Sequence, residues 1–98
     1  MTWSVKLLSE ARKDFEKLDG SVRKSVLKKL VKLETNPYYG DMLGNKAGID
    51  LTGYFKMYAD DKRIRIIYKI IDHEVHLIAI DKREDMEVYK LASQRIKT

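Results

Sequence analysis

The sequence contains no cysteine, and this absence excludes two kinds of architecture. Neither a disulfide framework nor a metal site built on thiolates can form without cysteine. The chain also lacks an apolar run of the ~18 residues that a membrane-spanning helix needs. Its first ten residues include Lys6 and Glu10 and do not read as a signal peptide. These absences predict a cytoplasmic protein that has no membrane partner.

Several catalytic patterns are missing as well. There is no G-x-S-x-G element and no P-loop. The two histidines, His73 and His76, have no further ligands at metal-binding spacing, and we expect them at a surface turn and on an exposed strand position. The acidic residues Asp60, Asp61 and Asp72 fall in predicted turns, where aspartate is a common turn former. We therefore expect neither a metal nor a cofactor.

The residues that are present describe a small basic protein. With 98 residues, the chain is long enough for one hydrophobic core, and we expect a single domain over 1–98. The formal net charge is +5, and it is unevenly spread: residues 1–40 hold nine basic and five acidic side chains, whereas 41–98 hold eleven and ten. An excess of this size is compatible with a polyanionic partner but does not identify one.

The N-terminal part has the pattern of a strand followed by two helices. Trp3, Val5 and Leu7 alternate with polar residues, as in a half-buried strand. We expect Ser9 to cap a first helix that ends at 19–20, and Ser21 to cap a second that ends at 36–37. The second helix has an apolar stripe of Val22, Val26, Leu30 and Leu33, widened by Leu27 and Val31. The two helices should form a hairpin.

The C-terminal part has the pattern of three strands and a helix. Residues 38–52 show no periodicity and read as a loop, whereas 53–59, 63–71 and 75–80 read as strands joined by tight turns. Apolar residues between 88 and 96 predict a final short helix. The order β-α-α-β-β-β-α predicts an α+β fold, in which the helical hairpin covers one face of a small antiparallel sheet.

Two charged surfaces stand out in this arrangement. On the second helix, Lys24, Lys28, Lys29 and Lys32 share an arc of about 140° with Ser25 and without any acid. This arc is either an ordinary solvated helix face or a surface that attracts phosphates.

On the sheet, alternation places Tyr54, Lys56 and Tyr58 on the face turned away from the hairpin. Arg65 interrupts an apolar strand, and Lys82 and Arg83 end the last strand. Charged strand residues usually point to solvent, so the alternative reading is a plain polar surface. Read together, the basic and aromatic side chains favour phosphate chemistry.

Three segments carry a resemblance to a known family. Leu51–Lys56, Arg65–Tyr68 and Asp81–Tyr89, in this order after a basic helical hairpin, resemble the RelE/ParE superfamily of bacterial toxin–antitoxin systems. The resemblance spans 8–95. It implies a compact toxin, monomeric when alone, that an antitoxin protein wraps and neutralises in a hetero-oligomer.

The resemblance also implies a choice between two targets. The RelE-like branch cuts mRNA in the ribosomal A site, and the ParE-like branch poisons DNA gyrase without a nuclease site. The RelE-like residues fall on Lys56, Arg65, Arg83 and Tyr89, but a second lysine of that pattern is Tyr58 here. We expect a metal-independent endoribonuclease that acts on the ribosome. A gyrase inhibitor and an inactive relic that acts as a corepressor remain the alternatives.

In RNA cleavage by the 2′-OH without a metal ion, each of these four RelE-like residues would have a chemical role. Arg65 would stabilise charge on the phosphorane, because its planar fork contacts phosphate oxygens in pairs. Lys56 would be the base, which requires nearby cations to lower its pKa from the usual ~10.4. Arg83 would serve the leaving group, and Tyr89 would stack on a base. The helix lysines Lys24, Lys28, Lys29 and Lys32, together with Tyr54, Tyr58 and Lys82, would bind mRNA or rRNA.

Overall fold

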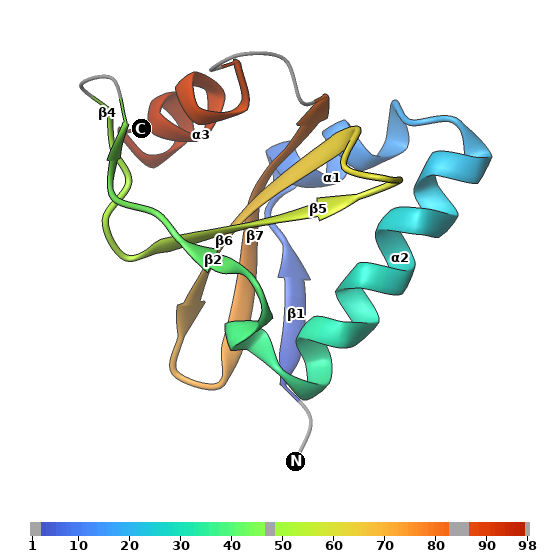
Figure 1. Ribbon diagram of the computed structural model, residues 1–98, viewed down its shortest axis with the longest axis horizontal. Coiled ribbons are helices and arrows are strands. Elements are labelled where there is room, and N and C mark those ends of the chain that lie inside the picture. The colour runs from blue at the N-terminus through green and yellow to red at the C-terminus, as the bar shows by residue number, and fades with distance from the viewer. Residues whose placement is uncertain (1–2, 47–48, 83–86, 98) are drawn as a thin grey trace.

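A five-stranded sheet forms the centre of the structure, and helices cover both of its faces (Figure 1). The computed structural model describes residues 3–46, 49–82 and 87–97. The elements in chain order are β1 (Ser4–Leu7), α1 (Ser9–Glu16), α2 (Gly20–Thr35), the 3-10 turn η1 (Pro37–Tyr39), β2 (Asp41–Met42), β3 (Asn45–Lys46), β4 (Ile49–Asp50), β5 (Tyr54–Ala59), β6 (Ile64–Ile71), β7 (Glu74–Lys82) and α3 (Glu87–Lys97). The predicted α+β class and element order are confirmed.

The sheet combines the predicted meander with a parallel edge strand. Its order is β1-β7-β6-β5-β2, and β5, β6 and β7 are antiparallel neighbours. β1 pairs in parallel with β7, with Val5 opposite Val75. The expectation of a plain loop over 38–52 was wrong, because η1 and three two-residue strands lie within it; β2 extends the sheet beside β5.

The helix starts differ from the predicted caps. Leu8 occupies the N-cap of α1 without a side-chain hydrogen bond, so Ser9 lies inside the helix. Asp19 caps α2, and its Oδ1 accepts from the backbone N–H of Ser21 at 3.1 Å and of Val22 at 3.2 Å. Both predicted serine caps were wrong; at α2 the preceding aspartate takes the capping position.

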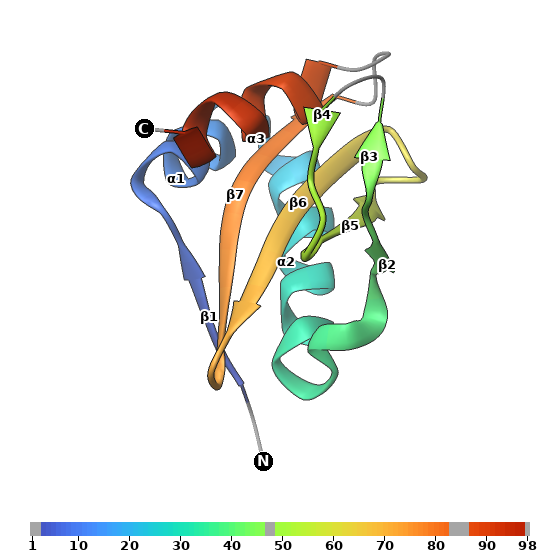
Figure 2. The same cartoon turned by 90° about the vertical axis from the view of Figure 1, so that its left-hand side faces the viewer.

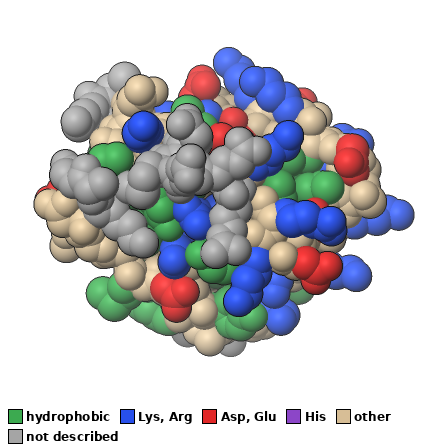
Figure 3. Space-filling view, turned by 45° about the horizontal axis from the view of Figure 1, so that its top comes forward, with side chains coloured by type: hydrophobic (Ala, Val, Ile, Leu, Met, Phe, Trp, Pro, Cys, Tyr) green, Lys and Arg blue, Asp and Glu red, His purple; other side chains and the backbone are tan. Residues whose placement is uncertain are grey.

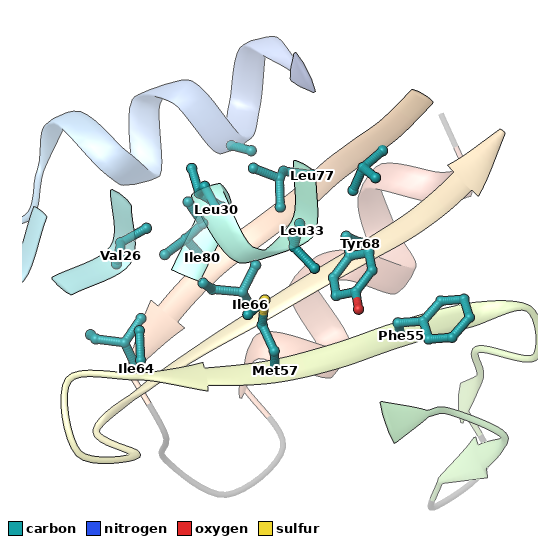
Figure 4. Packing of buried hydrophobic residues seen from close by; sticks show 13 residues of the cluster. Val26, Leu30, Leu33, Phe55, Met57, Ile64, Ile66, Tyr68, Leu77 and Ile80 are labelled. Atoms are coloured by element: carbon teal, nitrogen blue, oxygen red, sulfur yellow. The ribbon is translucent and has the colours of Figure 1, made fainter. Parts of the chain in front are cut away.

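The hairpin of α1 and α2 packs on one face of the sheet (Figure 2). Figure 4 shows Leu30 and Leu33 of α2 above Met57 and Tyr68 of the sheet. The apolar stripe of α2 is narrower than predicted, because Leu27 and Val31 are 49% and 60% exposed.

The opposite face of the sheet carries α3. Val88, Tyr89 and Ala92 of α3 form a second buried cluster with Ile67 and Ile78 of the sheet. The predicted alternation along β5 is confirmed, because Phe55, Met57 and Ala59 belong to the hairpin side. The side chains of Tyr54, Lys56 and Tyr58 therefore lie on the α3 side. None of the helices in the described part of the chain is both long and apolar enough to cross a membrane.

One ion pair connects the two faces. Asp14 of α1 binds Arg95 of α3 through two hydrogen bonds, of 2.6 Å and 3.0 Å. The same carboxylate accepts from the Ile80 N–H at 3.0 Å, and Arg95 donates to the Ile78 carbonyl at 2.8 Å. Both helices are thus anchored to β7 at one point.

Candidate functional site

Four of the predicted site residues lie together on the α3 side of the sheet. The ammonium nitrogen of Lys56 donates a 3.1 Å hydrogen bond to the Tyr58 hydroxyl. The guanidinium carbon of Arg65 lies 5.4 Å from the centroid of the Tyr58 ring and 4.8 Å from that of the Tyr89 ring. The cluster therefore has two cations and two phenols.

Strand register and α3 together build this cluster. Tyr58 of β5 is directly opposite Arg65 of β6, so the two side chains share a face of the sheet. Lys56 lies two residues before Tyr58 and therefore on the same face. α3 places Tyr89 on the other side of Arg65, so that the guanidinium lies between two aromatic rings.

Two of these residues are more deeply buried than the sequence analysis expected. Arg65 is only 8% exposed and Tyr89 only 1%. Arg65 is therefore not a solvent-facing strand residue. Tyr89 cannot offer a ring face to a nucleobase in this arrangement, as the sequence analysis expected, because the ring packs beside Arg65. The ring lies against the Arg65 guanidinium instead.

The electrostatics of Lys56 differ from the expectation. The hydrogen bond to Tyr58 raises the pKa of Lys56, and this effect exceeds the opposing ones of burial and of the Arg65 charge. The predicted lowering was wrong, because the nearest group to the ammonium is a phenol oxygen rather than another cation. The same hydrogen bond, helped by the charge of Arg65, lowers the pKa of Tyr58. Lys56 keeps its proton, and Tyr58 loses its proton more readily than a free tyrosine.

A groove of about 600 Å³ extends from this cluster to α2. Lys56 and Tyr58 of β5 line it, together with Lys28, Lys29 and Lys32 of α2. The groove contains five lysines and three aspartates in all. Figure 3 shows the Lys and Arg side chains gathered over this region, interrupted by acidic groups. The two surfaces predicted separately thus meet in one groove.

Tyr39 belongs to this groove and was missed by the sequence analysis. The ammonium groups of Lys29 and Lys32 lie 5.6 Å and 5.1 Å from the centroid of its ring. Their charges lower the pKa of the Tyr39 hydroxyl. The available signal was a pair of tyrosines directly after Pro37, next to the end of a basic helix.

The other predicted RNA-binding residues lie outside this groove. Lys24 is exposed on α2, and Lys82 is exposed at the end of β7. Tyr54 packs beside Lys69, whose ammonium lies 5.6 Å from its ring centroid, and both line a second hollow of about 370 Å³. Arg83 lies outside the described residues.

The histidines occupy the other end of the β6–β7 hairpin. His73 is exposed in the turn, with its ring 5.4 Å from that of Trp3. His76 is partly buried, not exposed as predicted, and its Nε2 lies 3.0 Å from the Glu74 carboxylate. The described residues contain no group of three or more His, Cys, Asp or Glu side chains that could hold a metal ion.

Comparison with known proteins gives full-length similarities. The chain is 32% identical over 99% of its length to the whole of a putative RelE-like toxin protein of Escherichia coli. It is 31% identical, over 98% of its length and 99% of the relative, to the mRNA interferase toxin RelE of Escherichia coli strain K12. No family model matches the chain.

Solved structures share the fold as well. A mutant of the E. coli toxin RelE, in which two arginines are replaced by alanine and which was solved in the free state, superposes on this chain with a TM-score of 0.73 at 29% identity. The similarity covers 98% of this chain and 99% of that one. The toxin–antitoxin complex RelBE2 of Mycobacterium tuberculosis contains a chain that superposes with a TM-score of 0.70 at 25% identity, covering 85% of this chain and all of that one.

Proposed function

This chain belongs to the RelE family of toxins, and from that premise we propose that it is a ribosome-dependent endoribonuclease that cleaves mRNA in the A site and inhibits translation. The observation that carries the proposal is the cluster of Lys56, Tyr58, Arg65 and Tyr89, of which Lys56 and Tyr58 line a groove that contains five lysines. The relative from E. coli strain K12 is named an mRNA interferase, and this supports the nuclease over a gyrase inhibitor.

The proposed partners follow from the relatives. A chain of this fold occurs in the RelBE2 toxin–antitoxin complex. We propose that this toxin is a monomer when alone and forms a hetero-oligomer with a cognate antitoxin. Its site of action would be the cytoplasm, where ribosomes translate mRNA.

The groove would hold the RNA backbone. Lys28, Lys29 and Lys32 of α2 line it together with Lys56 of β5, so consecutive phosphates of one strand can contact cations from both elements. The three aspartates of the groove weaken attraction to any loose polyanion. This fits a protein that binds RNA productively only when a larger scaffold positions the strand.

Arg65 would stabilise the charge that develops on the phosphorane. Its guanidinium has the planar fork geometry that contacts two phosphate oxygens at once. The rings of Tyr58 and Tyr89 on either side restrict its rotation, so it is oriented before RNA arrives. Tyr89 acts as a positioning residue in this scheme. Arg83 is proposed for the leaving-group side, as the family resemblance implies.

The reaction would need no metal ion. The attacking group is the 2′-OH of the RNA itself, so no metal-activated water is required to serve as nucleophile. Charge on the phosphorane is compensated by Arg65 and Lys56. The products would be a 2′,3′-cyclic phosphate and a 5′-hydroxyl.

Primer extension on mRNA under translation tests the proposal. We expect cleavage by the wild-type protein and a loss of at least about 100-fold for Arg65→Lys, which keeps the charge but loses the fork. Lys56→Gln and Arg83→Ala should lose a comparable factor. Lys90→Gln, an exposed position next to Tyr89 on α3, is the matched control and should cleave normally.

Circular dichroism melts of every variant exclude unfolding as the cause, which matters because Arg65 is buried. A DNA supercoiling assay runs in parallel. Inhibition of gyrase without mRNA cleavage would replace this proposal by the ParE-like alternative. The absence of both mRNA cleavage and gyrase inhibition, together with normal growth of cells that express the protein, would identify an inactive relic.

A further inference from the structure

The contact between Lys56 and Tyr58 joins two groups that can exchange a proton. The two residues lie on the same face of β5, and the ammonium nitrogen is 3.1 Å from the phenol oxygen. The ammonium also lies over the ring of Tyr58, at 5.2 Å from its centroid. Both side chains line the groove that we propose for RNA. Their polar atoms are therefore adjacent to each other and accessible from the same side.

The charges around this pair favour one distribution of the proton. Arg65 lies opposite Tyr58 on β6, and its charge stabilises a phenolate. The pKa of Tyr58 is lowered, first by the hydrogen bond from Lys56, whereas the pKa of Lys56 is raised by the same bond. Lys56 is thus the member that holds a proton, and Tyr58 is the member that can give one up.

The histidines and the aspartates of the β5–β6 turn are less well placed as bases than Tyr58. Both histidines lie at the other end of the β6–β7 hairpin, and His76 is bound to Glu74. Asp60 is bound to Arg63 at 3.1 Å, and the Asp61 side chain is 96% exposed. Asp41, opposite Lys56 on β2, also lines the groove, whereas Tyr58 accepts a hydrogen bond from the Lys56 ammonium. The position two residues after Lys56 is a lysine in the related pattern and Tyr58 here.

We propose that Tyr58 and Lys56 form a catalytic pair, in which the Tyr58 phenolate is the general base and the Lys56 ammonium is the general acid of RNA cleavage. This inference rests on the proposed nuclease function and adds the roles of its proton-transfer groups. It reverses the role that the sequence analysis assigned to Lys56.

The step balances within the pair. The phenolate oxygen takes the proton of the 2′-OH as the 2′-oxygen forms a bond to phosphorus. The bond from phosphorus to the 5′-oxygen breaks, and this oxygen takes a proton from Lys56. The enzyme is left with a neutral phenol and a neutral amine in contact. Transfer of the phenol proton to the amine, across their own hydrogen bond, restores the starting state without a solvent proton.

The pH dependence follows with a definite sign. Tyr58 also shares its groove with Lys28, Lys29 and Lys32 of α2, with Tyr39 and Asp41, and with Asp60, Asp61 and Lys62 of the β5–β6 turn, and Tyr89 of α3 contacts the same Arg65. The cleavage rate should rise with pH while the Tyr58 phenol ionises, and it should fall at higher pH where Lys56 loses its proton. Exposed Tyr38, which does not line the groove, is a suitable reference tyrosine.

Single-turnover cleavage of mRNA on programmed ribosomes, measured against pH, tests the pair. Tyr58→Phe should lose at least about 100-fold, and the remaining activity should lack the rising limb of the pH profile. Tyr38→Phe removes one hydroxyl from an exposed position outside the groove and should leave the profile unchanged. Wild-type cleavage together with an unchanged rate and profile for Tyr58→Phe would overturn the inference.

A second measurement works on the free protein and does not depend on cleavage. In protein labelled with ¹³C at tyrosine Cζ, the Tyr58 signal, assigned by its loss in Tyr58→Phe, should titrate at lower pH than free tyrosine. Lys56→Met should move the Tyr58 titration to higher pH. Titration of Tyr58 at or above the pH of free tyrosine, or without a response to Lys56→Met, would refute the pair even where cleavage is observed. Absence of cleavage by the wild type would instead refute the nuclease.

Discussion

At the scale of single residues, Arg65 illustrates how a charge can be kept inside a small sheet protein. It is 8% exposed, on a strand that is otherwise apolar at most positions. The rings of Tyr58 and Tyr89 flank its guanidinium, and such contacts contribute about 1–2 kcal/mol when they are shielded from water. The guanidinium of Arg65 is therefore held against two aromatic rings inside the protein.

Tyr68 is a second buried polar residue with a defined task. Its hydroxyl donates to the Pro37 carbonyl at 2.9 Å and accepts from the Gly40 N–H at 2.9 Å, so it holds η1 against the sheet. Tyr68→Phe removes both bonds and leaves two backbone groups without this partner. We expect a loss of about 1–2 kcal/mol in the free energy of unfolding, measured by urea denaturation.

The ionisation of Tyr68 makes the free energy of unfolding depend on pH in the alkaline range. Burial raises the pKa of Tyr68 from 10.0 to about 12. Because the folded value is the higher one, the contribution of the neutral phenol is complete below about pH 10 and is lost as the pH rises through 12. The stability difference between wild type and Tyr68→Phe should shrink over this interval. A constant difference would contradict the assignment.

The sequence predicted the faces of the sheet better than the contacts on them. Strict alternation along β5 correctly placed Lys56 and Tyr58 on one face, because the period of a strand is two residues whatever surrounds it. It did not predict that these two would bond to each other, and so the direction of the Lys56 pKa was wrong. Tyr39 escaped notice because its contact with α2 depends on the turn η1, which has no periodicity.

At the scale of elements, the helices could be predicted from local sequence patterns, whereas the pairing of distant strands could not. The helices were recognised from their apolar stripes, but Asp19 rather than Ser21 caps α2, since either residue type can fill that position. The parallel pairing of β1 with β7 joins the first strand to the last, and nothing in the composition of either strand indicates it.

The ion pair between Asp14 and Arg95 is another distant contact, and it ties α1 and α3 to β7. The two side chains are 11% and 16% exposed. Asp14→Ala should lower the free energy of unfolding by about 3 kcal/mol, because Arg95 would retain a largely buried charge without its partner. Glu16→Ala removes an exposed carboxylate from the same helix and should change stability little.

A double-mutant cycle separates the pair from its surroundings. Adding Arg95→Met to Asp14→Ala should cost less than the sum of the single changes, because the unpaired charge is then gone. Strictly additive losses in thermal or urea unfolding would show that the two residues do not depend on each other.

At the scale of the whole molecule, the placement of the +5 charge is more informative than its size. The groove is lined by lysines of α2, from the basic N-terminal part, and by Lys56 of the nearly neutral C-terminal part. Neither half of the chain forms this surface alone. The charge difference between the two halves indicated the basic face of α2, but it did not indicate that Lys56 of the other half lines the same groove.

Replacing Lys28, Lys29 and Lys32 together by glutamine tests the groove as an RNA surface. The slope of log affinity against log salt for a short single-stranded RNA should fall by about 2, at ~0.7 for each lost phosphate contact. The matched control replaces Lys13, Lys17 and Lys90, which are exposed and do not line the groove. If both triple variants lower this slope equally, as measured by fluorescence anisotropy, the groove lysines act only through the net charge of the protein.

The parallel pairing of β1 with β7 also affects when the cluster can form during synthesis. Translation proceeds from the N-terminus, so β1 is made well before its partner β7 and before Tyr89 of α3. A nascent chain therefore has an unfinished sheet and an incomplete cluster until α3 has been made. The order of the strands makes the complete cluster a late product of synthesis.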